Sequence, residues 1–174
     1  MNPDYPIEAM TLLLDQQCIT EKYAPLIPLA EKLLAGCLRL GCRTKSDAQR
    51  LSDADCQSIG LPTEEAIRLF RRFLTLYDLK PQKFKEQNDS DYDPKTLASL
   101  RELYCLPGVK QIRATLYFLS GYRSLSDLAH ADALEILEKT KQTIEERNLS
   151  CSIPLPKEVR THIAVAKAFT FESQ

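Results

Sequence analysis

Apolar side chains recur every three or four residues through most of this 174-residue chain, which is the spacing of helices that bury one face. No segment of convincing length alternates apolar and polar residues as a half-buried strand does. The most regular runs are Ile7, Met10, Leu13 and Leu14; Leu29, Leu33, Leu34, Cys37 and Leu38; Ile67, Phe70, Leu74 and Tyr77; Leu97, Leu100, Leu103 and Tyr104; and Val159, Ile163 and Ala166. The sequence therefore predicts an all-α protein.

Two further helices with less regular stripes are predicted in the second half of the chain. The earlier of the two has the expected inward residues Val109, Ile112, Leu116 and Leu119. The later one begins at Asp132, because Asp132 and Glu135 have the spacing of a capping box. Its expected inward residues are Leu134, Leu137 and Ile144, with Lys141 interrupting the stripe.

Two segments eighty positions apart, Gly41–Ala48 and Gly121–Leu128, have similar sequences. They share Gly, Arg, Ser and Asp at matching positions, Thr44 aligns with Ser124, and each segment follows an apolar helix. We interpret the similarity as an internal duplication.

The duplication predicts two similar helical units, residues 1–79 and residues 94–174. Between them, residues 80–93 are polar and lack a helical period, so they form the predicted linker. Units of this size bury only a marginal core when alone, and we therefore expect the two to pack together.

The stretch best suited to binding a ligand is Leu106–Lys110, where a Pro-Gly pair separates two apolar helical runs. A tight turn that leads into a helix leaves backbone N–H groups without intrahelical partners, and the helix dipole favours an anion there. The phosphate groups of nucleic acid are such anions. The candidate nucleic-acid-binding residues are Gly108, Val109, Lys110, Arg113 and Arg123.

This stretch resembles the helix-hairpin-helix motif of DNA-repair and replication proteins. The resemblance rests on Leu106, Pro107, Gly108, Val109, Ala114 and Leu116. Lys110 stands where the motif has its second glycine, which replaces a flexible backbone position with a cation. In the register of the repeat Pro28 aligns with Gly108, so the first unit lacks the hairpin glycine.

Over residues 20–170, apart from the linker, the chain also resembles an uncharacterised bacterial family of tandem helix-hairpin-helix domains, the domain of unknown function 4332. That resemblance implies two tandem helix-hairpin-helix (SAM-like) units, and the family has no settled biochemical role that the resemblance could carry over.

Charge argues against a protein that coats nucleic acid electrostatically, because the formal net charge is -1. Residues 39–123 carry 15 basic and 11 acidic groups, which makes them a weakly basic belt between acidic ends. Two functions remain open. One is weak, sequence-independent DNA binding through phosphate contacts, and the other is a protein–protein adaptor in which the hairpin only connects two helices.

Catalytic and metal-binding signatures are absent from the sequence. There is no Gly-x-Ser-x-Gly, Walker or His-Glu-x-x-His motif, and the six cysteines include no Cys-x-x-Cys pair. We expect no enzyme activity, cofactor, metal or small-molecule substrate, with the cysteines buried as reduced thiols. No apolar run approaches the roughly 20 residues of a membrane span and no signal peptide is evident, so a cytoplasmic protein is expected.

Overall fold

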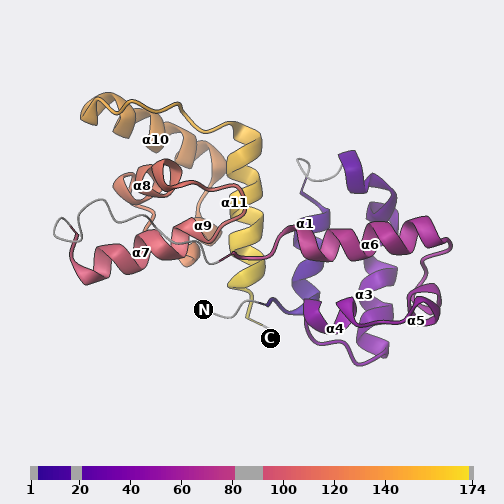
Figure 1. Cartoon of the computed structure of the whole chain (residues 1–174). Helices are drawn as coiled ribbons and strands as arrows, with labels where there is room; N and C mark the ends of the chain where they lie inside the picture. Colours follow the sequence, from indigo (N-terminus) through magenta and orange to yellow (C-terminus); the bar gives the residue numbers. More distant parts are fainter. Residues whose placement is uncertain (1–3, 17–20, 81–91, 173–174) are drawn as a thin grey trace. The chain divides into compact units, whose positions relative to one another are not determined.

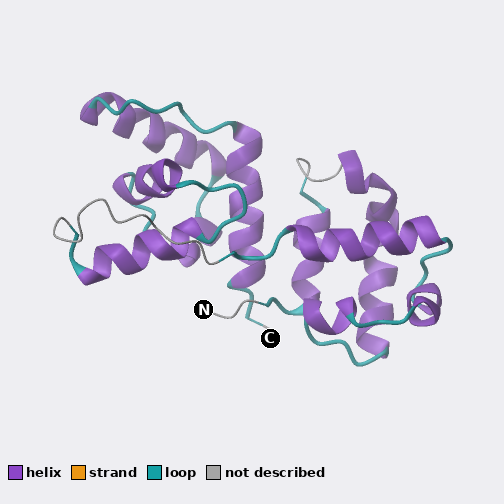
Figure 2. Cartoon of the chain, viewed as in Figure 1, coloured by secondary structure: helices purple, strands orange, loops and turns teal. Residues whose placement is uncertain are grey.

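The structure is a computed structural model that describes residues 4–16, 21–80 and 92–172. The described residues form helices and no sheet, which confirms the all-α prediction (Figures 1 and 2). The α-helices are α1 (Met10–Leu14), α3 (Ala30–Arg39), α4 (Lys45–Gln49), α5 (Asp53–Ser58), α6 (Glu64–Leu76), α7 (Pro94–Tyr104), α8 (Gln111–Leu119), α9 (Leu125–His130), α10 (Ala133–Arg147) and α11 (Pro156–Phe169). Two 3-10 segments, Ile7–Ala9 and Ala24–Leu29, precede α1 and α3.

The chain divides into two compact units. The first comprises Met1–Asp78 together with Lys167–Gln174, and the second comprises Leu79–Ala166. Most of the predicted linker, residues 81–91, lies outside the described residues. The last residue of the predicted linker, Asp93, caps α7, because its carboxylate accepts hydrogen bonds from the N–H groups of Lys95 and Thr96.

The core of the first unit lies where α1 and the 3-10 segment Ala24–Leu29 pack against α3. Ring contacts extend it onto α6, since Phe73 meets Tyr23 and Tyr77 edge-on at centroid distances of 5.5 and 5.9 Å. Gly36 allows α3 to approach the end of α5, because a Cβ there would lie 2.5 Å from the Cβ of Ile59. The fully buried aliphatic side chains include Ile7, Met10, Leu13, Leu26 and Leu33.

In the second unit α7 packs along α8, and α10 also packs against α8. Its fully buried side chains include Leu100, Leu103, Leu106, Tyr117, Leu128, Ile136, Val159 and Val165. The turn between α7 and α8 is the predicted hairpin. The residues that position the candidate site therefore all belong to one unit.

The two repeated segments have the same local geometry. Gly41 and Gly121 adopt positive φ values of 81° and 97°, as expected where a left-handed residue ends a helix. Thr44 and Ser124 then cap the next helix, each accepting from the N–H three residues later. The same left-handed glycine and N-cap thus occur at both segments, and the duplication itself stays a prediction.

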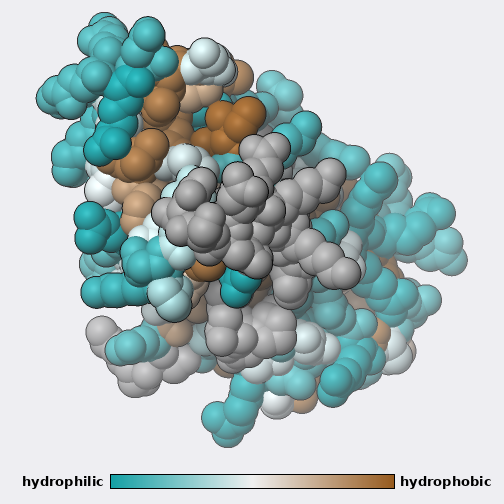
Figure 3. All heavy atoms as spheres, turned by 60° about the vertical axis from the view of Figure 1, so that its left-hand side comes forward, coloured by the Kyte–Doolittle hydropathy of each residue, from teal (hydrophilic) through white to brown (hydrophobic). Residues whose placement is uncertain are grey.

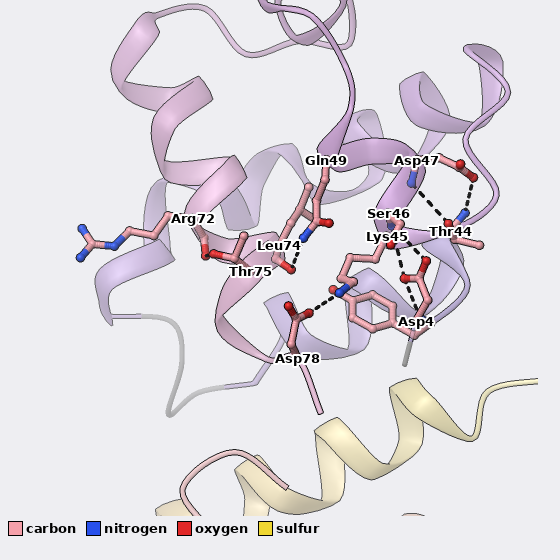
Figure 4. Close-up of polar contacts among 11 residues, drawn as sticks. Asp4, Thr44, Lys45, Ser46, Asp47, Gln49, Arg72, Leu74, Thr75 and Asp78 are labelled. Carbon is pink, nitrogen blue, oxygen red and sulfur yellow. Dashed lines mark hydrogen bonds and ion pairs between the residues drawn. The ribbon is translucent and has the colours of Figure 1, made fainter. Parts of the chain in front are cut away.

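One position in the repeat differs in chemistry. Lys45, buried in the first unit, pairs with the carboxylate of Asp78 (Figure 4), whereas Leu125 fills the matching position of the second unit. Figure 4 also shows Asp4, whose carboxylate accepts a hydrogen bond from the N–H of Ser46 at 3.2 Å. The first unit thus uses charged groups where the second uses an apolar side chain.

The predicted stripes of α8 and α10 are partly wrong. Ile112 and Leu134 were expected inward, but they are 66% and 70% exposed. In α10 the buried residues are Ile136, Thr140 and Thr143 instead. Both threonine hydroxyls donate to carbonyls one turn earlier in the helix, which satisfies them inside the core and lets an apparently polar face turn inward.

Candidate nucleic-acid interface

The hairpin is a tight turn over Leu106–Val109. The N–H of Val109 donates to the carbonyl of Leu106 at 3.1 Å, and Gly108 has φ +78°. A type II β-turn has this arrangement, with proline as its second residue and a glycine of positive φ as its third. A Cβ added to Gly108 would meet no atom within 4 Å, so the turn is open on its outer side.

Val109 supports the turn from inside. Its side chain is 1% exposed, and its N–H is used by the bond to Leu106. An amide held within the turn is not available to a phosphate. Of the three amides predicted to bind, those of Gly108 and Lys110 therefore remain candidates.

The N-terminus of α8 follows directly. Lys110 is exposed and occupies the N-cap position, with extended backbone and no hydrogen bond from its side chain to the helix. Side chains do cap other helices of the described chain, namely Thr44, Ser52, Thr63, Asp93, Ser124 and Asp132. The N-cap residue of α8 thus offers no side-chain acceptor of the kind that those N-cap residues supply, and the helix dipole there favours an anion.

Arg113 is already engaged within the protein. Its Nε lies 2.7 Å from Oε1 of Glu158, and its Nη1 donates to the carbonyl of Ser152 at 3.0 Å. The two side chains of the ion pair are 16% and 28% exposed. Arg113 consequently ties α8 to the start of α11, and a phosphate would have to compete with Glu158 for it.

Arg123 lies beyond the other end of α8. Its guanidinium sits 5.5 Å from the ring centroid of Phe118, and its N–H donates to the carboxylate of Asp127. At about 1.5 Å per residue, the nine residues of α8 separate Arg123 from the turn by about 13 Å. The structure therefore groups Gly108 and Lys110 at one place and Arg123 at another.

Behind the turn lies a buried polar pair. Tyr117 of α8 and His162 of α11 are 0% and 3% exposed, and the Tyr117 hydroxyl lies 2.7 Å from Nδ1 of His162. The backbone of Pro107 also lies near the imidazole and opposes the lowering of its pKa. Burial lowers the pKa of His162 to about 4, with Glu158 opposing the shift and Arg113 adding to it, so the ring is neutral near pH 7.

The corresponding surface of the first unit is built differently. The 3-10 segment Ala24–Leu29 takes the place of the hairpin, with Pro28 inside it and Leu26 buried. Arg39, at the other end of α3 from this segment, donates to the carbonyl of Ser58 at 3.0 Å. Without an open glycine turn, this surface does not repeat the hairpin's geometry.

Figure 3 shows a face on which hydrophobic side chains interrupt the hydrophilic surface. In the second unit the most exposed large apolar residues are Ile112, Leu134 and Leu155. At the hairpin itself the exposed side chain of Lys110 and the dipole of α8 supply the electrostatic attraction for an anion.

None of the five described thiols is in a disulfide, and four of them are buried: Cys37, Cys42, Cys56 and Cys105. Cys18 lies outside the described residues. Burial raises the pKa of Cys37 to about 12. Within residues 4–16, 21–80 and 92–172, no group of three His, Cys, Asp or Glu side chains is placed to hold a metal ion. None of the described helices is long and apolar enough to cross a membrane.

A protein-family model matches residues 66–169, which is more than half of the chain. It describes the domain of unknown function DUF4332. The chain belongs to this family. The matched range contains the entire hairpin and ends with the last residue of α11. No curated protein and no solved structure matches the chain.

Family membership confirms the resemblance seen in the sequence, while the helix-hairpin-helix character of the turn stays a prediction. The sequence did not identify Glu158 or His162 as part of the site. Each meets the hairpin region across 45 residues or more, and no local pattern marks such a contact. The available signal in the sequence was a histidine, His162, on the otherwise apolar face of the last helix.

Proposed function

We propose that this protein binds DNA weakly and without sequence preference, through the hairpin of its second unit. The observation that carries the proposal is the open turn at Gly108, followed directly by the N-terminus of α8, where the N-cap side chain of Lys110 makes no capping hydrogen bond. A phosphate oxygen placed there would accept from the N–H groups of Gly108 and Lys110. The ammonium of Lys110 would add charge at the same phosphate.

The roles of the five predicted residues differ in this proposal. Gly108 and Lys110 contact the phosphate, while Val109 and Arg113 hold the turn and the start of α8 in place. Arg123, about 13 Å away along α8, reaches a second phosphate. Contacts of this kind position a protein on the backbone and carry no sequence information.

The expected affinity is low because few cations converge on the turn. Neutralising about two phosphates gives a dissociation constant in the non-specific range of about 1 μM to 0.1 mM, with a slope of log K against log salt of about -2. A DNA partner agrees with the cytoplasmic location expected from the sequence.

Fluorescence anisotropy with a labelled duplex at two salt concentrations tests the proposal. Lys110→Glu should weaken binding about tenfold or more, because it places an acid against the phosphate. The matched control is Lys95→Glu, which makes the same charge change at an exposed position in the first turn of α7, at the far end of that helix from the hairpin. Equal affinities for the two variants, or no binding by the wild type at low salt, would refute DNA binding through the hairpin.

A protein–protein adaptor is the second candidate function, favoured by the exposed apolar side chains Ile112 and Leu155. Pull-down before and after nuclease treatment separates the two. A protein partner that is retained after nuclease supports the adaptor, whereas recovery that depends on nucleic acid supports DNA binding.

A further inference from the structure

The end of α3 brings two cysteines, Cys37 and Cys42, into one backbone motif. The N–H of Cys42 donates to the carbonyl of Cys37 at 2.9 Å, and the N–H of Gly41 donates to the carbonyl of Leu38 at 3.0 Å. Gly41 itself has φ +81°. Two such bonds around a left-handed glycine make a Schellman motif, in which the side chains of the first and last residues frequently pack together. Those two residues are the cysteines.

The backbone bond also limits the distance between the two Cα atoms. Within a residue, the Cα lies about 2.4 Å from its own carbonyl oxygen and about 1.5 Å from its own nitrogen. With the 2.9 Å bond between them, the Cα atoms of Cys37 and Cys42 are at most about 6.8 Å apart. Disulfides join residues whose Cα atoms are about 4.4–6.8 Å apart, so the backbone holds this pair at a distance that a disulfide can span.

Both side chains turn into the core of the first unit. Cys37 and Cys42 are 0% and 4% exposed. The second unit has the same motif at the end of α8, where the N–H of Tyr122 donates to the carbonyl of Tyr117 at 3.0 Å and both side chains are again buried. The pKa values agree with close packing of the two thiols, since each thiol contributes to the shift of the other.

We propose that Cys37 and Cys42 are a reversible redox pair, which hydrogen peroxide converts into a disulfide at the end of α3. The sulfur of Cys42 attacks one peroxide oxygen and becomes a sulfenic acid, and the other oxygen leaves as water. The sulfur of Cys37 then attacks the sulfenic sulfur, so that the S–S bond forms and a second water leaves. The two sulfurs together give two electrons to the peroxide, and each thiol gives up its proton.

The order of the two steps follows from burial. Cys42 reacts first because it is the less buried of the two. Burial raises the pKa of both thiols, that of Cys37 to about 12, so both stay protonated near pH 7 and the reaction is slow. A neighbouring thiol closes a sulfenic acid to a disulfide before further oxidation makes it an irreversible sulfinic acid. Cys37 therefore keeps an oxidised Cys42 recoverable.

Mass spectrometry of the peroxide-treated full chain tests the proposal. Trypsin places Cys37 on residues 33–39 and Cys42 on residues 40–43, two peptides that only a disulfide joins. The folded protein is treated with hydrogen peroxide, its remaining thiols are alkylated, and it is digested without a reductant. The joined peptides should be the main disulfide product, and dithiothreitol should return both thiols.

Cys56 provides the matched control. It has the same position at the end of α5, where the N–H of Leu61 donates to its carbonyl at 3.2 Å, but its partner in the motif is a leucine. Cys56→Ser should therefore leave the yield of joined peptides unchanged, whereas Cys42→Ser should abolish them. Cys37→Ser should leave a sulfenic acid on Cys42 that dimedone traps. Should Cys42→Ser not fold, Cys42→Ala provides the second variant.

A native disulfide is distinguished from random pairing by repeating the treatment in urea, where a mixture of cysteine pairs should form. If peroxide oxidises Cys151 of the folded protein but leaves Cys37 and Cys42 as thiols, they are not a redox pair. A disulfide between Cys37 and Cys56 would equally overturn the proposal. DNA binding enters none of these measurements, so they are decided separately from the proposed function.

Discussion

Lowering the pH from about 7 to about 5 should destabilise the folded protein through His162. Burial holds the pKa of this side chain at about 4, against 6.5 for an ordinary histidine. Between these values the unfolded chain binds a proton that the folded protein does not. The contribution of the neutral ring is therefore complete above about pH 6.5 and is lost as the pH falls toward about 4.

The size of the effect follows from the shift of the pKa. Over the whole window it amounts to about 3 kcal/mol, and between pH 7 and pH 5 to about 2 kcal/mol. The free energy of unfolding of a small domain is about 5–15 kcal/mol, so a loss of this size is a large part of the total stability.

Urea unfolding followed by circular dichroism at the two pH values measures this loss. The wild type should lose about 2 kcal/mol, and His162→Gln should lose much less because glutamine does not titrate. His130→Gln is the control, since His130 is exposed and only bonds to the carbonyl of Ser126. An equal loss in His162→Gln and in the wild type would refute the reasoning.

The titration of these carboxyl groups does not interfere with the unfolding measurement between pH 7 and pH 5. Hydrogen bonds lower the pKa values of three acids at helix N-termini, Asp47, Asp55 and Asp93. A carboxylate with a lowered pKa stabilises the fold above its unfolded value of about 3.8, and that contribution is lost only as the pH falls further. Above about pH 5 these acids affect the wild type and the variants alike.

Two further predictions concern the first unit. Lys45→Met should lower the free energy of unfolding, measured in urea, by about 2–4 kcal/mol, because it leaves the partly buried carboxylate of Asp78 without its cation. Adding Asp78→Asn should recover most of the loss. A double-mutant cycle without coupling energy would show that the two side chains do not act as a pair. Gly36→Ala should lower the free energy of unfolding by at least about 2 kcal/mol, because its Cβ would clash with Ile59. Gly41→Ala, at φ +81° in open space, should lower it by only about 1 kcal/mol. The reverse ranking would contradict the close approach of α3 and α5.

The helix ends were predictable because they depend on neighbours in the chain. Asp93 precedes a proline and Asp132 has the spacing of a capping box, and both cap helices in the structure. The repeat likewise identified Gly41 and Gly121, whose positive φ ends each preceding helix.

The inward faces of α8 and α10 were less predictable, because burial depends on what packs against a helix. Thr140 is fully buried since its hydroxyl bonds within its own helix, while Leu134 in the first turn of α10 stays exposed. The residues of the candidate site were likewise predictable only where they depend on a local motif. The sequence identified Gly108 and Lys110 from a local motif, but the contact between Arg113 and Glu158 joins residues 45 positions apart and changes an expected DNA contact into a structural one.

The central claim, that the hairpin of the second unit contacts DNA phosphates, is tested most directly by titrating a short duplex into the ¹⁵N-labelled protein at low salt. The proposal predicts that the amide resonances of Gly108 and Lys110 shift first and furthest, and that those of Ala24–Leu29 in the first unit stay in place. If the duplex shifts other residues while Gly108 and Lys110 do not move, or if no resonance shifts at duplex concentrations of about 0.1 mM, the hairpin does not bind DNA.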